Sequence, residues 1–105
     1  MKYVFEVTLK PKVSRQQYID AWKKGSAIIQ KQPGALGTEL HEKIGADGFL
    51  AVASWASKDA RDRAMSELKN ADAETRAALD KHLEFGYIKI IGSFEDAEWK
   101  VNPRS

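Results

Sequence analysis

The hydrophobic residues of this chain follow two different periods, and the order in which the periods alternate narrows the fold to one arrangement. Apolar side chains recur at roughly every second residue over residues 3–9, 33–44, 49–55 and 87–94, as in strands. They recur at helical spacing over residues 18–29 and 60–83. The sequence therefore predicts the order β-α-β-β-α-β, the split βαβ arrangement of a ferredoxin-like α+β sandwich. A chain of 105 residues is long enough for one such domain.

Local signals mark the ends of these elements. Ser14 and Gln17 have the spacing of a capping box, and Pro33 ends the helix that they begin. Ser57 is suited to cap the second helical segment, and Asp72 to restart it after a kink. The run Gly-Ala-Asp-Gly at residues 45–48 predicts a hairpin turn between the second and third strands.

The second predicted strand contains a glycine, Gly37, where a strand would normally carry a side chain. Counting every second residue places it on one side with Ala35, Glu39 and His41. A β-bulge, or a dimer contact that needs no side chain, would explain the glycine. The alternative is a ligand that approaches the backbone closely at this position.

Composition excludes several classes of partner and site. The 17 Lys and Arg residues and 15 Asp and Glu residues are scattered along the chain, so we expect no nucleic acid partner. The absence of cysteine excludes disulfides and thiolate metal sites, and is consistent with a reducing compartment. Neither a signal-peptide pattern nor a long apolar run occurs, so we expect a cytoplasmic protein with no membrane partner.

Both faces of the predicted sheet contain apolar residues, although two helices can cover only one of them. The third strand presents one apolar set on one side and a second set on the other: Phe49, Ala51, Ala53 and Trp55 against Leu50 and Val52. The fourth strand is divided in the same way: Ile88, Ile90 and Phe94 against Tyr87 and Ile91. Sheets that are apolar on both faces are buried on both faces. We therefore predict a face-to-face homodimer.

The segments "PGALGTELHEK", "FLAVASW" and "ASKDARDRAM" resemble the antibiotic biosynthesis monooxygenase (ABM) domain family, within the dimeric α/β-barrel superfamily. The resemblance covers residues 3–94. It implies that two ferredoxin-like sheets pair into a barrel and that each subunit holds a pocket between its sheet and its helices. The predicted division is an ABM-like domain at residues 1–94 and a C-terminal tail at residues 95–105. Trp99 in that tail is expected to rest on the partner subunit.

Five residues are candidates for the site. His41 and His82 are candidate catalytic proton-transfer groups because histidine titrates near neutral pH. The competing interpretations are an exposed strand residue for His41 and a helix-end residue near the C-terminal dipole for His82. Trp22, Trp55 and Tyr87 are candidate substrate-binding walls, or else packing anchors. The two histidines lack metal-ligand spacing, so no metal site is predicted.

The resemblance implies a cofactor-independent monooxygenase acting on small or polycyclic aromatic substrates of phenol, quinol or anthrone type. Such a substrate supplies its own electrons after deprotonation, so no cofactor is expected. A non-catalytic ligand-binding or stress-related dimer is the alternative from another class. A small-metabolite isomerase would need the same base. A haem-degrading monooxygenase fits less well, because the first strand lacks the asparagine and the second helix the tryptophan that those relatives use.

Overall fold

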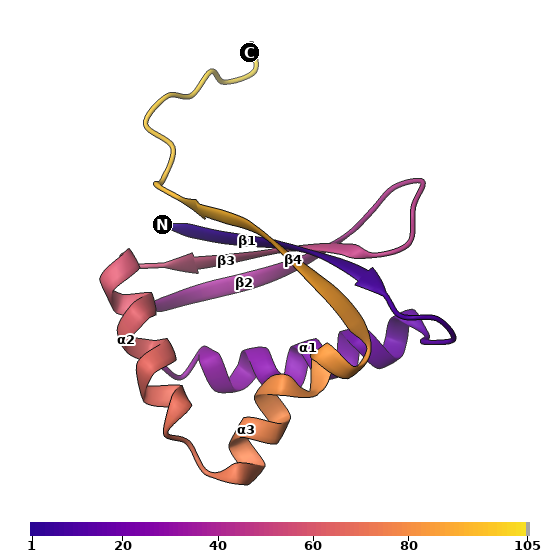
Figure 1. The fold of residues 1–105 in the computed structure, drawn as a ribbon. Helices are drawn as coiled ribbons and strands as arrows, with labels where there is room; N and C mark the ends of the chain where they lie inside the picture. The colour runs from indigo at the N-terminus through magenta and orange to yellow at the C-terminus, as the bar shows by residue number, and fades with distance from the viewer. Residues whose placement is uncertain (105) are drawn as a thin grey trace.

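The computed structural model describes residues 1–104, in which a four-stranded antiparallel sheet carries its helices on one face (Figure 1). In chain order the elements are β1 (Lys2–Leu9), α1 (Arg15–Ile29), β2 (Ala35–Glu42), β3 (Phe49–Trp55), α2 (Lys58–Lys69), α3 (Ala73–Asp80), the 3₁₀ turn η1 (Lys81–Glu84) and β4 (Gly86–Phe94). The strands lie in the order β2-β3-β1-β4. This arrangement confirms the predicted ferredoxin-like α+β fold.

The helices begin where the sequence signals predict. Ser14 and Gln17 form the complete capping box of α1, and the Ser57 side chain accepts a hydrogen bond from the backbone N–H of Ala60 in α2. Asp72 caps α3, so the helical segment is divided into two helices that meet at an angle (Figure 1). None of the helices within residues 1–104 is long and apolar enough to cross a membrane.

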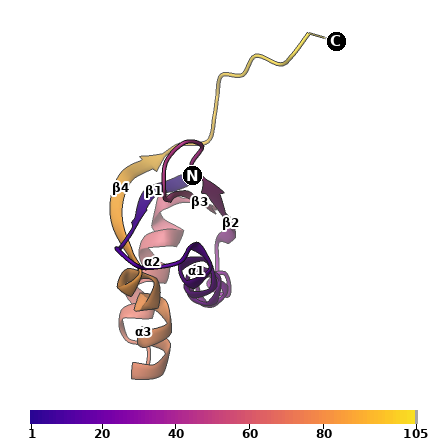
Figure 2. The same cartoon turned by 90° about the vertical axis from the view of Figure 1, so that its right-hand side faces the viewer.

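The core lies between the sheet and the helices, which Figure 2 shows gathered on one side of the strands. Val7 and Phe49 face each other across β1 and β3, and both are buried against Tyr18 of α1. A second cluster contains Trp55 and Ala64, which joins the end of β3 to α2. These two clusters leave space between them, where the candidate site lies.

A β-bulge accounts for the glycine in β2. The register with β3 shifts between Ala35 and Thr38, and Gly37 within that shift has a φ of 102°. A Cβ atom built on Gly37 meets nothing within 4 Å, so the glycine serves the backbone conformation rather than a close approach. The bulge also reverses the alternation: Thr38 faces the helices, whereas His41, opposite Leu50, lies on the open face. The predicted grouping of Ala35 with His41 was therefore wrong.

A second register shift lies between β1 and β4, at Val4 and Phe5. Phe94 is consequently paired with Lys2 on the open face, while Ile88 is paired with Val7 on the helix face. The prediction that Phe94 shares a face with Ile88 was wrong, because simple alternation does not anticipate a bulge. Residues 95–104 form no helix or strand and extend away from the sheet (Figures 1 and 2).

Candidate functional site

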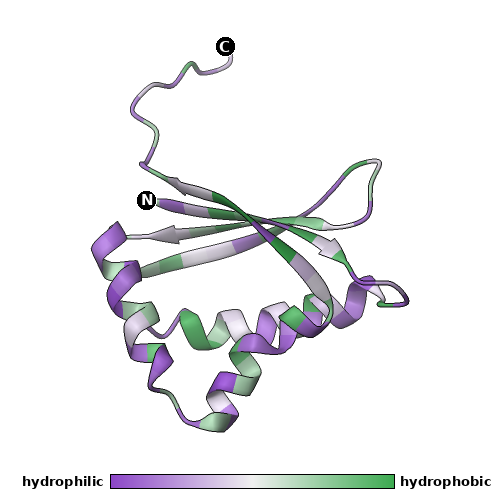
Figure 3. Cartoon of the chain, in the orientation of Figure 1, coloured by the Kyte–Doolittle hydropathy of each residue, from purple (hydrophilic) through white to green (hydrophobic). Residues whose placement is uncertain are grey.

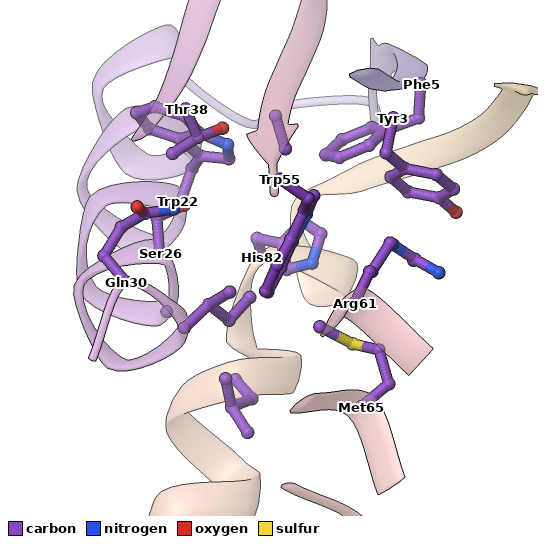
Figure 4. Close-up of a pocket in the computed structure, with 14 residues that line it drawn as sticks. Tyr3, Phe5, Trp22, Ser26, Gln30, Thr38, Trp55, Arg61, Met65 and His82 are labelled. Atoms are coloured by element: carbon purple, nitrogen blue, oxygen red, sulfur yellow. The ribbon is translucent and has the colours of Figure 1, made fainter. Parts of the chain in front are cut away.

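A cavity of about 120 Å³ lies between the sheet, α1, α2 and the α3–η1 segment (Figure 4). Most of its wall is apolar or aromatic. Its fourteen lining residues come from every layer of the domain: Tyr3, Phe5, Trp22, Gly25, Ser26, Ile29, Gln30, Thr38, Ala53, Trp55, Arg61, Met65, Leu79 and His82. A cavity of this kind can hold a flat apolar ring and a few polar groups.

Three of the five predicted site residues meet in this cavity. Trp22 belongs to α1, Trp55 is the last residue of β3, and His82 lies in η1. Figure 4 shows Trp55 and His82 in the middle of the site, with Trp22 on the α1 side. Trp55 is almost completely buried, so it serves the core as well as the cavity wall.

His41 and Tyr87 lie elsewhere. His41 is exposed on the open face, where its Nε2 atom lies 3.1 Å from a carboxylate oxygen of Glu39. Tyr87 of β4, paired with Thr8, is 59% exposed, and the ammonium group of Lys10 lies over its ring. Neither residue lines the cavity.

The His82 side chain is held in place by a hydrogen bond to the phenol group of Tyr18 in the core. Its Nδ1 atom lies 3.0 Å from Oη of Tyr18, and the two rings meet edge to face at a centroid distance of 5.7 Å. The change from α-helix to the tighter η1 turn places His82 against the cavity, together with Leu79, whereas Leu83 is exposed. Within residues 1–104, Nε2 of His82 has no hydrogen-bond partner and is the ring nitrogen left for a ligand.

Burial affects the two partners in opposite ways. Desolvation lowers the pKa of His82 below its usual 6.5, and the nearby charge of Asp80 opposes this only in part. Desolvation raises the pKa of Tyr18, which is completely buried and stacked on Phe49 at 5.5 Å. The absence of a side chain at Gly86 makes room for this tyrosine, because a Cβ there would lie 3.0 Å from the ring. At neutral pH the pair is therefore a neutral imidazole and a neutral phenol.

The hydrogen bond between this pair can run in either direction. If the Tyr18 hydroxyl donates to Nδ1, the neutral ring carries its proton on Nε2 and is a donor. If the Nδ1–H group of His82 donates to Oη, Nε2 has a free lone pair and can accept a proton. Protonation at Nε2 leaves the Nδ1–H bond to Tyr18 intact, so the tyrosine can support the charged imidazole ring.

Arg61 was not singled out from the sequence, although it is the one permanently charged residue in the cavity lining. It lies in the first half of α2, and its guanidinium group stacks on the ring of Tyr3 at 3.6 Å. The Ser57 side chain caps α2 just before this position, and the contact with Tyr3 shows that Arg61 faces the sheet. Arg63, two residues later, is exposed and lies on another side of the helix. The sequence offered no reason to separate the two arginines.

The α1 and β2 walls supply the neutral polar groups. Gln30 Oε1 accepts a hydrogen bond of 2.8 Å from the backbone N–H of Gly37, which ties the bulge to the end of α1. The Thr38 hydroxyl lies 3.4 Å from the carbonyl oxygen of Val52. Within residues 1–104 no cluster of three or more His, Cys, Asp or Glu side chains is placed to hold a metal ion.

Comparison with known proteins gives matches among solved structures only, since no protein-family model and no curated protein matches the sequence. A variant of SnoaB, a cofactor-independent oxygenase from Streptomyces nogalater, superposes with a TM-score of 0.74 at 14% identity, over 91% of this chain and 92% of that chain. At3g17210 from Arabidopsis thaliana gives 0.71 at 10% identity, over 95% and 98%. A Bacteroides thetaiotaomicron protein with the provisional name antibiotic biosynthesis monooxygenase gives 0.66 at 12% identity, over 97% and 95%.

These identities are too low to transfer an activity, but the coverage extends over nearly the whole of each chain. The chain has the ferredoxin-like α+β fold of solved proteins that are named as antibiotic biosynthesis monooxygenases and cofactor-independent oxygenases.

Proposed function

We propose that the chain is a cofactor-independent monooxygenase that oxidises aromatic substrates of phenol, quinol or anthrone type in this cavity. The observation that carries the proposal is the partly buried His82, a neutral imidazole that lines an aromatic cavity and is supported at Nδ1 by Tyr18. The shared fold with SnoaB, named as a cofactor-independent oxygenase, supports the same reaction class.

The proposed reaction begins with transfer of the phenolic proton to Nε2 of His82. A base must be unprotonated to act, and the lowered pKa of His82 keeps it so at neutral pH. The imidazolium that forms keeps its Nδ1–H bond to Oη of Tyr18. The proton acceptor therefore remains oriented before and after the transfer.

Dioxygen then acts as the oxidant. For a quinol, one oxygen atom forms a new carbon–oxygen bond on the ring, and the other leaves as water with two hydrogens taken from the substrate. The ring gives up four electrons and becomes a hydroxyquinone, which balances the four electrons that dioxygen accepts. The role of the protein is to remove the proton and to exclude water, since an aromatic anion held by the rings of Phe5, Trp22 and Trp55 loses its hydration shell.

We also propose that two copies form a homodimer through the open face and the β4 edge. Four apolar side chains along β4 are exposed by 45% to 62%: Tyr87, Ile90, Ile91 and Phe94. Trp99 in the tail is 87% exposed. Large exposed apolar groups that lie close together are typical of an interface, and pairing through this face would give the dimeric barrel that the sequence resemblance implies.

The test of the activity is oxygen consumption by purified, metal-free protein with a panel of quinols, naphthols and anthrones, with heat-denatured protein as the background. We expect uptake above background with at least one substrate and formation of a hydroxylated or quinone product. Binding of panel members without any oxygen uptake would contradict the proposal, and a non-catalytic ligand-binding protein would then be the better interpretation.

A further inference from the structure

The position of Arg61 suggests which aromatic compounds the cavity takes. Arg61 is only partly exposed, and within residues 1–104 it forms neither an ion pair nor a side-chain hydrogen bond. The neighbouring acidic residue Asp62 is paired instead with Lys58, at 2.7 Å. An arginine that lines an apolar cavity without an anionic partner is ready to bind an anion supplied by a ligand.

The stacking on Tyr3 holds the guanidinium group in place. The Arg61 Cζ atom lies over the Tyr3 ring at 3.6 Å from its centroid, so the guanidinium group rests against this wall of the cavity. Figure 4 shows Arg61 beside Tyr3 and Met65, on the opposite side of Trp55 from Ser26 and Gln30. Stacking occupies one face of the group and leaves its N–H donors available in the plane, where a carboxylate accepts two parallel hydrogen bonds.

The size of the cavity limits the ring system. An engineered apolar cavity of about 150 Å³ in another protein binds benzene, and the cavity here has a similar volume of about 120 Å³. One ring fills that space, whereas the further rings of a fused system would extend beyond it. His82 and Arg61 then provide two polar positions around a single ring, one for a hydroxyl group and one for an anion.

We propose that the substrates are single-ring phenols or quinols that carry a carboxylate, bound with the carboxylate on Arg61 and the hydroxyl at His82. The inference rests on the proposed function for one point, that the substrate hydroxyl lies at His82. The predicted binding of the carboxylate to Arg61 can be measured without turnover. The partly desolvated setting strengthens the pairing of guanidinium and carboxylate relative to a fully exposed pair.

The test compares para-hydroxybenzoate with its neutral counterpart para-hydroxybenzamide by isothermal titration calorimetry. The charged acid should bind about tenfold or more tightly than the amide, because a charge-assisted bidentate pair replaces a neutral contact. Arg61→Gln should reduce the affinity for the acid to that for the amide and leave the amide almost unchanged. Arg61→Lys should give an intermediate affinity, since lysine keeps the charge but not the planar fork.

Arg63→Gln is the matched control, because Arg63 is exposed on the same helix and does not line this cavity. It changes the net charge by the same amount and should leave both affinities unchanged. Thermal unfolding followed by circular dichroism checks that each variant folds. Equal affinity for acid and amide, or an unchanged acid affinity in the folded Arg61→Gln protein, would overturn the inference.

The two proposals fail in different ways. Oxygen uptake that depends on His82 but shows no preference for carboxylates would leave the oxygenase standing and remove the role of Arg61. Suppose instead that the acid binds in a way that depends on Arg61, while no quinol that binds consumes oxygen. That result would support the anion site and contradict the proposed oxygenase activity.

Discussion

The two histidines lie on opposite faces of one sheet and differ in almost every physical respect. His41 is exposed beside the carboxylate of Glu39 on the open face. His82 is partly buried, bonded to a phenol, and its pKa is lowered by desolvation. The same side chain therefore faces solvent on one side of the sheet and a cavity on the other. The comparison shows that the face, rather than the residue type, decides which histidine reaches the cavity.

The surroundings of the histidines differ in the same way. Charged and apolar side chains alternate on the open face, where Lys43 pairs with Glu6 and lowers the pKa of that carboxyl group. On the helix face, hydrophobic residues of the strands pack against those of the helices, and Figure 3 shows hydrophobic positions on both the strands and the helices. The open face is thus more polar than the sequence analysis anticipated, and the exposed apolar residues concentrate on β4 and in the tail.

The largest expected effect comes from neighbouring residues of β3 that face opposite ways. Phe49→Ala should cost about 3–5 kcal/mol of unfolding free energy, because it removes a ring that packs on Tyr18 in the core. Leu50→Ala, on the open face, should cost about 1 kcal/mol of unfolding free energy, because the Leu50 side chain is only partly buried. Urea unfolding measures both. If the free energy lost in Leu50→Ala rises with protein concentration, a second copy covers this face. If Phe49→Ala and Leu50→Ala lose the same free energy at low concentration, the two faces of the sheet do not differ in burial.

The second effect concerns catalysis. His82→Gln should lower the rate of oxygen uptake by about 10²–10⁴-fold, which is the usual contribution of a positioned base. His41→Gln should leave the rate within about twofold, because His41 does not line the cavity. The rate of the unchanged protein should fall on acidification only below pH 6.5, where His82 becomes protonated. A rate loss in His41→Gln alone would assign the base to the open face.

The third effect tests whether the C-terminal tail contributes to the proposed dimer interface on the open face. Removal of residues 95–105 should raise the dimer dissociation constant about tenfold or more, since a tryptophan that becomes buried in an interface, as we propose for Trp99, is often a dominant contact. Sedimentation velocity over a range of concentrations measures the constant. Trp99→Ala in the full chain should reproduce most of the change, whereas Lys100→Ala provides a control from the same exposed segment. An unchanged constant in the truncated chain would exclude the tail from the interface.

The fourth effect concerns the bulge that sets the two faces of β2. Gly37→Ala should cost about 1–3 kcal/mol, because alanine disfavours a positive φ. The strain is backbone strain alone, since nothing lies within 4 Å of the added methyl group. Gly25→Ala is an informative contrast, because its added Cβ would approach Ala78 while φ stays helical. Chemical denaturation compares them, and a neutral Gly37→Ala would show that the bulge does not need glycine.

The element order was predictable from sequence because its signals are local. The capping box, the other helix caps, the turn glycines and the two hydrophobic periods each depend on residues a few positions apart. A β-bulge at Gly37 was one of the explanations that the sequence allowed, but the register shift at Val4 and Phe5 was not anticipated, because such a shift depends on the pairing of strands. Tyr18 and His82 are 64 residues apart, and no local pattern connects them. Arg61 and Arg63 differ only in helical phase. Trp22, Trp55 and His82 were separate candidates from the sequence, and the fold places all three in one cavity.

The smallest effect is the contribution of His82 to stability as the pH changes. Its pKa is lowered in the folded protein, so between pH 6.5 and that lower value the unfolded chain binds a proton that the folded chain does not. Stability should therefore fall as the pH decreases from 7.5 through 6.5, and this contribution should level off below the folded pKa. Urea unfolding at fixed protein concentration should show a smaller decrease between pH 7.5 and 5 for His82→Gln than for the unchanged protein. His41→Gln should keep most of the decrease, because that ring lies exposed on the open face and does not line the cavity. If the His41 variant instead removed the decrease, the desolvated histidine would lie on the open face, and the contrast between the two faces would have to be reversed.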